Sequence, residues 1–164
     1  MKRCIGITVL FFMFIGCGIY SFSGSSLPSH LKTVELPLLE NQSMEPDIAD
    51  DIAKELNQQI LSGNLLRIVT ADGDATISGS ITNYRHEPYT FGAADTRQVD
   101  VEQYVVKIDA KITFFDNVKD EPLFDDNISA QGIYDFSNET EEIGKERAIK
   151  DMVERILQSS LQSW

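Results

Sequence analysis

The chain has 164 residues and carries 26 acidic against 14 basic side chains, a formal net charge of −12. This balance excludes the basic footprint of a nucleic-acid-binding protein. No cluster of Lys and Arg marks the chain for an anionic lipid surface. The length suits one domain with a single core.

The N-terminus has the composition of a secretory signal. Lys2 and Arg3 are followed by an uninterrupted apolar run from Cys4 to Ile15, which is too short to span a bilayer. The next residues complete the sequence Phe-Ile-Gly-Cys17, which resembles the lipobox of bacterial lipoproteins, whose cysteine is acylated and becomes the first mature residue. We therefore expect a signal peptide over residues 1–16. Cleavage at a small residue with Cys17 incidental, and a membrane-spanning anchor, are the alternatives.

Lipidation of Cys17 would tether the chain to a membrane, because two or more acyl chains give stable attachment where one gives only marginal binding. Cys4 would leave with the signal, so no thiol would remain for a disulfide, a metal or catalysis. Gly18, rather than Asp, follows the cysteine. By resemblance to sorted bacterial lipoproteins, this favours the outer membrane.

The first half of the mature chain predicts a tether, a strand and a helix. Residues 17–32 are rich in serine and are expected to form a flexible tether. Residues 33–39 favour a strand, and Pro37 near its end indicates that this strand lies at the edge of a sheet. A helix with Pro46 at its first position and an apolar residue every fourth position should follow, ending at Gly63.

The second half predicts a sheet and a second helix. Extended segments are expected at Leu65–Thr70, Ala75–Tyr84, Val101–Phe115 and Leu123–Tyr134, with a bulge at the doubled Asp125-Asp126. Asn138 with Glu141 has the spacing of a capping box and should open the last helix. The order β-α-β-β-β-α predicts an α+β two-layer sandwich over residues 33–164, with two helices on one face of a four-stranded, mostly antiparallel mixed sheet.

The connection Arg85–Asp100 is long for a compact domain and contains Pro88 and Gly92. Loops of this length inside a compact domain are commonly functional or disordered. We therefore expect a loop here that forms a contact surface.

No pattern of catalytic residues is found. The two histidines, His30 and His86, stand apart from any nucleophile motif, and the acidic residues do not have the spacing of a calcium loop. The sequence therefore predicts no enzyme, no metal and no cofactor.

A few basic residues are the candidates for a contact with lipid phosphate or with a partner: Arg85, Arg97, Lys107 and Lys111. Arg85 and Arg97 flank or lie in the long connection, and the two lysines alternate along the strand Val101–Phe115. Ordinary cross-strand ion pairing and solubility are the simpler explanation of these residues.

Three stretches resemble LptE-like lipopolysaccharide-assembly lipoproteins: residues 16–24 around Cys17, Val34-Glu-Leu-Pro-Leu-Leu-Glu-Asn41 before the first helix, and Ile77-Ser-Gly-Ser-Ile-Thr-Asn-Tyr-Arg85 leading into Glu87-Pro-Tyr89. The resemblance implies an outer-membrane lipoprotein that faces the periplasm. It would plug an LptD-like β-barrel and support insertion of lipopolysaccharide into the outer leaflet, and some members bind lipopolysaccharide themselves. Two alternatives stay open: a tethered lipoprotein that recruits or activates an envelope protein such as a cell-wall synthase, and a lipoprotein that binds a soluble ligand.

Overall fold

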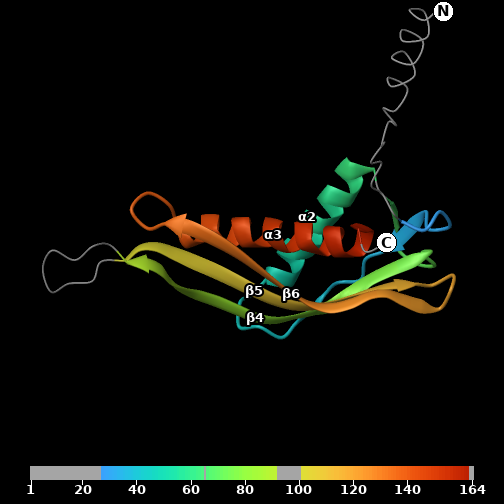
Figure 1. The fold of residues 1–164 in the computed structure, drawn as a ribbon, viewed down its shortest axis with the longest axis horizontal. Helices are drawn as coiled ribbons and strands as arrows, with labels where there is room; N and C mark the ends of the chain where they lie inside the picture. The colour runs from blue at the N-terminus through green and yellow to red at the C-terminus, as the bar shows by residue number, and fades with distance from the viewer. Residues whose placement is uncertain (1–26, 65, 92–100, 163–164) are drawn as a thin grey trace, which may run out of the picture.

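A long antiparallel ribbon forms the centre of the computed structural model, which describes residues 27–64, 66–91 and 101–162 (Figure 1). The ribbon consists of β4 (Ala75–Phe91), β5 (Val101–Asp116) and β6 (Glu121–Asp135). The helices are α2 (Ile48–Gly63) and α3 (Glu141–Gln162). The α+β class with two helices on a mixed sheet is confirmed.

Within the described residues the sheet has six strands, rather than the four expected. Three short strands, β1 (Thr33–Glu35), β2 (Glu40–Asn41) and β3 (Arg67–Val69), complete it in the order β3-β1-β4-β5-β6, with β2 also pairing β4. All pairings of these short strands are parallel. Only the first three residues of the predicted strand 33–39 form a strand, β1, and Pro37, which has no N–H to donate, lies in the gap before β2.

One core lies between the sheet and both helices. Ile52 of α2, Met152 and Ile156 of α3, and Ile108 and Ile112 of β5 are fully buried in it. The apolar positions of β5 repeat every second residue and those of α2 every fourth, which places each set on a single face. The two helices therefore cover the same face of the sheet.

The prediction of a loop over Arg85–Asp100 is wrong for residues 85–91, which form a strand. β4 continues to Phe91, and Arg85 to Phe91 pair with Val101 to Lys107 of β5. Pro88 is tolerated because no described strand pairs with the outer edge of β4 beyond Ile81, and because the register shifts next to Pro88. The remaining residues, 92–100, lie outside the described part of the chain.

Two further local predictions need correction. The irregularity in β6 lies between the pairs Phe114–Phe124 and Phe115–Pro122, whereas Asp125 and Asp126 pair regularly with β5. The helix α3 begins at Glu141, and the carbonyl of Thr140 accepts hydrogen bonds from the N–H groups of Ile143 and Gly144. Thr140 rather than Asn138 is therefore the N-cap residue.

The ends of α2 are set by residues in the left-handed region. Asp47 precedes the helix with φ 59°, so Pro46 lies before the helix and not at its first position. Gly63 is the last helical residue, as expected, and Asn64 follows with φ 49°. The Asn64 N–H bonds back to the helix, which satisfies one of its terminal carbonyls.

Candidate functional site

Three of the four basic residues identified as candidates from the sequence lie on the face of the sheet that the two helices do not cover, called here the uncovered face. Arg85 and Lys107 lie directly opposite one another on β4 and β5, and Lys111 lies further along β5. Arg85 Nη2 donates to Asp109 Oδ2 at 3.0 Å, Lys107 bonds to Glu87, and Lys111 Nζ lies 3.7 Å from Asp125 Oδ1. Each cation thus has a carboxylate partner. Arg97 lies outside the described residues.

Asp109 is the centre of this network. Besides the Arg85 guanidinium, it accepts a hydrogen bond from Ser129 Oγ at 2.6 Å and from Asn83 Nδ2 at 3.4 Å. The hydrogen bond and charge of Lys107 hold the pKa of Glu87 below its usual range. The face is therefore balanced in charge by its own side chains.

A second cluster, which sequence analysis missed, lies where the β4–β5 hairpin meets the start of α3. The rings of His86, Tyr104 and Tyr134 lie 5.0 to 5.9 Å apart. His86 Nε2 lies 2.9 Å from the Tyr134 hydroxyl, and Nδ1 lies 3.4 Å from Glu141 Oε2. A register shift between Ile81 and Asn83 brings His86 opposite Val106. The alternation of apolar and polar residues in the sequence does not reveal such a shift, so it could not predict which face His86 occupies.

Glu141 connects this cluster to the helix. The Tyr84 hydroxyl donates to Glu141 Oε1 at 3.2 Å. Burial, and then the Glu141 charge, raise the pKa of both Tyr84 and Tyr134. The tyrosines stay protonated at neutral pH, so the cluster is a set of mutual hydrogen bonds that fixes the hairpin to α3. Within the described residues, no group of three or more His, Cys, Asp or Glu side chains is placed to hold a metal ion.

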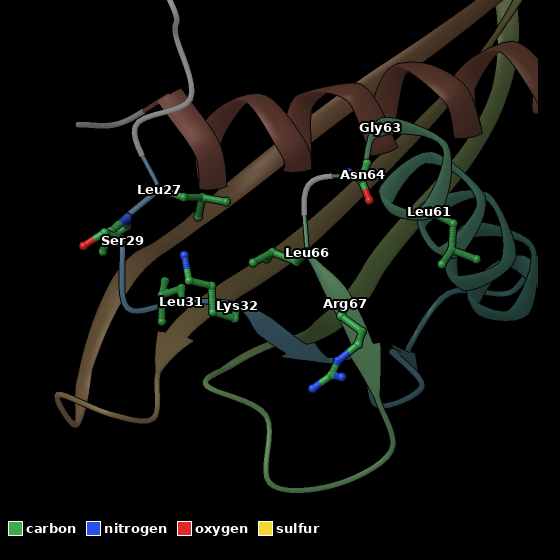
Figure 2. A pocket seen from close by; sticks show the side chains of 10 residues that line it. Leu27, Ser29, Leu31, Lys32, Leu61, Gly63, Asn64, Leu66 and Arg67 are labelled. Atoms are coloured by element: carbon green, nitrogen blue, oxygen red, sulfur yellow. The ribbon is translucent and has the colours of Figure 1, made fainter.

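A hollow of about 730 Å³ lies at the other end of the molecule (Figure 2). It lies between the segment that precedes β1, the end of α2 and the start of β3. Its lining combines leucines with two basic side chains: Leu27, Leu31, Leu61, Leu66, Lys32 and Arg67. Figure 2 shows Leu27 and Leu66 pointing towards one another. Lys32 and Arg67 are neighbours across β1 and β3, where the Arg67 N–H donates to the Lys32 carbonyl at 3.0 Å.

The segment beside this hollow was expected to belong to the tether, but its last residues are packed against the domain. Leu31 is buried, and His30 Nε2 lies 2.6 Å from Asp116 Oδ2. Asp74 Oδ2 accepts the N–H groups of Lys32 and Thr33, each at 2.9 Å. The chain therefore enters the domain at a fixed place, beside the β5–β6 turn.

A family model for lipopolysaccharide-assembly proteins, LptE, matches residues 31–160. The match covers most of the chain and all the described strands. The chain belongs to the LptE family. A search of curated proteins found no match.

Solved structures share the fold of this LptE-family chain at low sequence identity. The hypothetical protein CT253 from Chlamydia trachomatis has a TM-score of 0.55 and 7% identity, covering 79% of this chain and 98% of its own. A neuraminyllactose-binding hemagglutinin homologue from Helicobacter pylori has a TM-score of 0.53 and 10% identity, covering 85% and 88%. PelC from Paraburkholderia phytofirmans, a dodecamer, has a TM-score of 0.50 and 14% identity, covering 85% and 95%. At these identities the likeness concerns the fold alone.

Among the helices that the structure describes, none is long and apolar enough to cross a membrane. The LptE-family domain has two distinct ends, since the hairpin of β4 and β5 and the start of the described chain lie at opposite ends of its long axis (Figure 1). The aromatic cluster lies towards the hairpin end. The leucine-lined hollow lies at the end where the chain enters.

Proposed function

We propose that this LptE-family chain is an outer-membrane lipoprotein, anchored through acyl chains on Cys17, that pairs with an LptD-like β-barrel and supports lipopolysaccharide assembly. The observation that carries the proposal is the family match over residues 31–160, which spans the folded domain. The signal-like N-terminus and Cys17 supply the anchor, because multiple acyl chains hold a protein stably at a bilayer.

The role we propose is non-catalytic. Arg85 and Lys107 have carboxylate partners on the same face, and His86 has partners at both ring nitrogens. An arrangement of this kind favours a surface that fits a partner by shape and polar complementarity over one that reacts with a substrate. The β4–β5 end would enter the barrel, because it lies farthest from the anchored end.

The test is depletion of the protein in the bacterium that produces it. We expect the amount of folded LptD-like barrel and the amount of surface lipopolysaccharide to fall together. Re-expression of the wild-type chain should restore both, and re-expression of a Cys17→Ala variant should restore them poorly, because the anchor is lost. Unchanged barrel and lipopolysaccharide levels after depletion would contradict the proposal.

A further inference from the structure

Two basic residues that line the hollow, Lys32 and Arg67, form no ion pair with a described acidic residue, and their backbones are joined by a hydrogen bond. Among the described residues, every Lys and Arg except Lys32, Lys54 and Arg67 forms an ion pair with another described residue. Lys32 and Arg67 are joined through their backbones and line the same hollow, whereas Lys54 lies on α2 away from it. The structure thus places two cations that are 35 positions apart in the sequence at the edge of one hollow, with their charged groups turned in different directions (Figure 2).

The acidic groups next to these cations are already engaged. Asp74 directs Oδ2 at the backbone N–H groups of Lys32 and Thr33, and these bonds hold its pKa below its usual range. Asp116 is fully buried and is bonded to His30. Neither carboxylate forms an ion pair with the side chain of Lys32 or Arg67. Both cations are therefore available to an anion from outside the domain.

Apolar side chains accompany the cations. Leu61, at the end of α2, is 66% exposed although it lines the hollow, whereas Leu66, which also lines it, is 8% exposed. A surface that combines exposed leucine with unpaired cations matches the interfacial region of a bilayer, where phosphate groups lie above the first methylenes.

The length of the chain places this surface near the membrane. Leu27 is the tenth residue after Cys17, and even a fully extended chain of ten residues spans only about 35 Å. An anchored domain is therefore held at a high effective concentration at the bilayer, so that a weak contact is sufficient to orient it.

We propose that Lys32, Arg67 and Leu61 form a docking surface for anionic phospholipid in the leaflet that holds the Cys17 acyl chains. This inference rests on the lipid anchor of the proposed function and not on the barrel partner. The two cations contact lipid phosphates while Leu61 enters the interface. The domain then rests on its N-terminal end, and the β4–β5 hairpin points away from the bilayer.

The test uses the mature chain, residues 17–164, which contains every described residue and has Cys17 as its single thiol. Coupling Cys17 to a maleimide lipid attaches the chain to vesicles without any cellular processing or barrel. Hydrogen exchange, followed by mass spectrometry, is compared on phosphatidylcholine vesicles and on vesicles with phosphatidylglycerol added. We expect exchange in the peptides that carry Lys32 and Arg67 to slow several-fold on the anionic vesicles only.

The matched control uses the third cation without an ion pair. A Lys32→Gln/Arg67→Gln variant should lose the protection, and Lys54→Gln should keep it. Equal protection on neutral vesicles, loss of protection in Lys54→Gln, or protection by lipopolysaccharide and not by phosphatidylglycerol would each overturn the inference. Because the anchor is synthetic, none of these outcomes depends on whether the proposed barrel pairing is correct.

Discussion

His30 and Asp116 lie 86 positions apart and are joined at 2.6 Å between Nε2 and Oδ2, with the Asp116 side chain fully buried. The other carboxylate oxygen accepts the N–H groups of Val118 and Lys119 at 2.9 and 3.0 Å. One buried carboxylate therefore fixes both the start of the domain and the β5–β6 turn.

Replacing Asp116 by alanine should lower the free energy of unfolding by about 2 kcal/mol, because buried hydrogen-bonding groups lose a charged partner. The loss of stability should be measurable as a lower urea concentration at the midpoint of unfolding. His30→Ala should cost less, since its ring is partly exposed and the backbone N–H bonds to Asp116 remain. A His30→Ala variant less stable than Asp116→Ala would contradict this account.

The same carboxylate predicts a pH dependence. Burial pushes the pKa of Asp116 up, but the hydrogen bonds from His30 and from two backbone N–H groups outweigh burial and hold the pKa below the usual 3.8. A carboxyl with a lowered pKa stabilises the fold above the unfolded pKa and loses this contribution as the pH falls through the folded pKa. Wild-type stability should decline below about pH 3.8. The Asp116→Asn variant should show a shallower decline in an acid titration of stability.

Lys145 joins the two helices. Its ammonium lies 3.1 Å from Glu45 Oε1 and 3.2 Å from Asp51 Oδ2, and its side chain is 11% exposed. Lys145→Ala should cost about 1–2 kcal/mol, because two carboxylates lose their shared cation.

The matched control for Lys145 is Lys150→Ala on the same helix, which removes an exposed pair with Glu146 and should cost about 0.5 kcal/mol or less. Burial lowers the pKa of Lys145, but the hydrogen bonds that its ammonium donates to Glu45 and Asp51 outweigh burial and raise it. Its contribution should therefore be present below the unfolded pKa and be lost in strong alkali. Equal losses in the two variants would refute a special role for Lys145.

Helix α3 packs on β6 at a glycine. A Cβ added to Gly132 would lie 2.0 Å from the Gly144 carbonyl oxygen and 2.5 Å from the Ala148 nitrogen, both backbone atoms. Gly132→Ala should therefore destabilise the fold by about 1–3 kcal/mol through overpacking. Thermal unfolding would measure this, with the exposed neighbour Gln131→Ala as the control. An unchanged midpoint for Gly132→Ala would show that the helix can move away at no cost.

The ion pairs of the uncovered face should contribute little. Arg85 is 49% exposed and Asp109 27% at the side chain. A double-mutant cycle between Arg85→Ala and Asp109→Ala should give a coupling energy of about 0.2–1 kcal/mol. A coupling of several kcal/mol would mean that this network holds the sheet together.

Local patterns in the sequence predicted much of the fold. The alternation along Val101–Phe115 and the four-residue apolar repeat of α2 each report which side of an element faces the core, and both elements form as expected. The hairpin beyond Tyr84 was missed because Pro88 and the register shifts interrupt the alternation by which a strand is recognised. Contacts between distant positions, such as His30 with Asp116, leave no periodic signal.

The candidate site was predictable to a smaller degree. The sequence placed Lys107 and Lys111 on one face correctly, but it could not show that Glu87 and Asp125 lie beside them. The pairing of Lys32 with Arg67 depends on the parallel β1–β3 register, which no local pattern encodes. Sequence spacing therefore identified three paired cations of the uncovered face and missed Lys32 and Arg67 beside the hollow.

The most direct test of the proposed pairing with a barrel is site-specific photo-crosslinking in intact cells. A photoreactive residue at position 89, near the end of β4 where Tyr89 is 47% exposed, should crosslink to an LptD-like outer-membrane β-barrel. The same residue at position 119, in the β5–β6 turn at the opposite end, should give little of this adduct. Adducts from position 89 only with soluble or inner-membrane proteins would contradict the account.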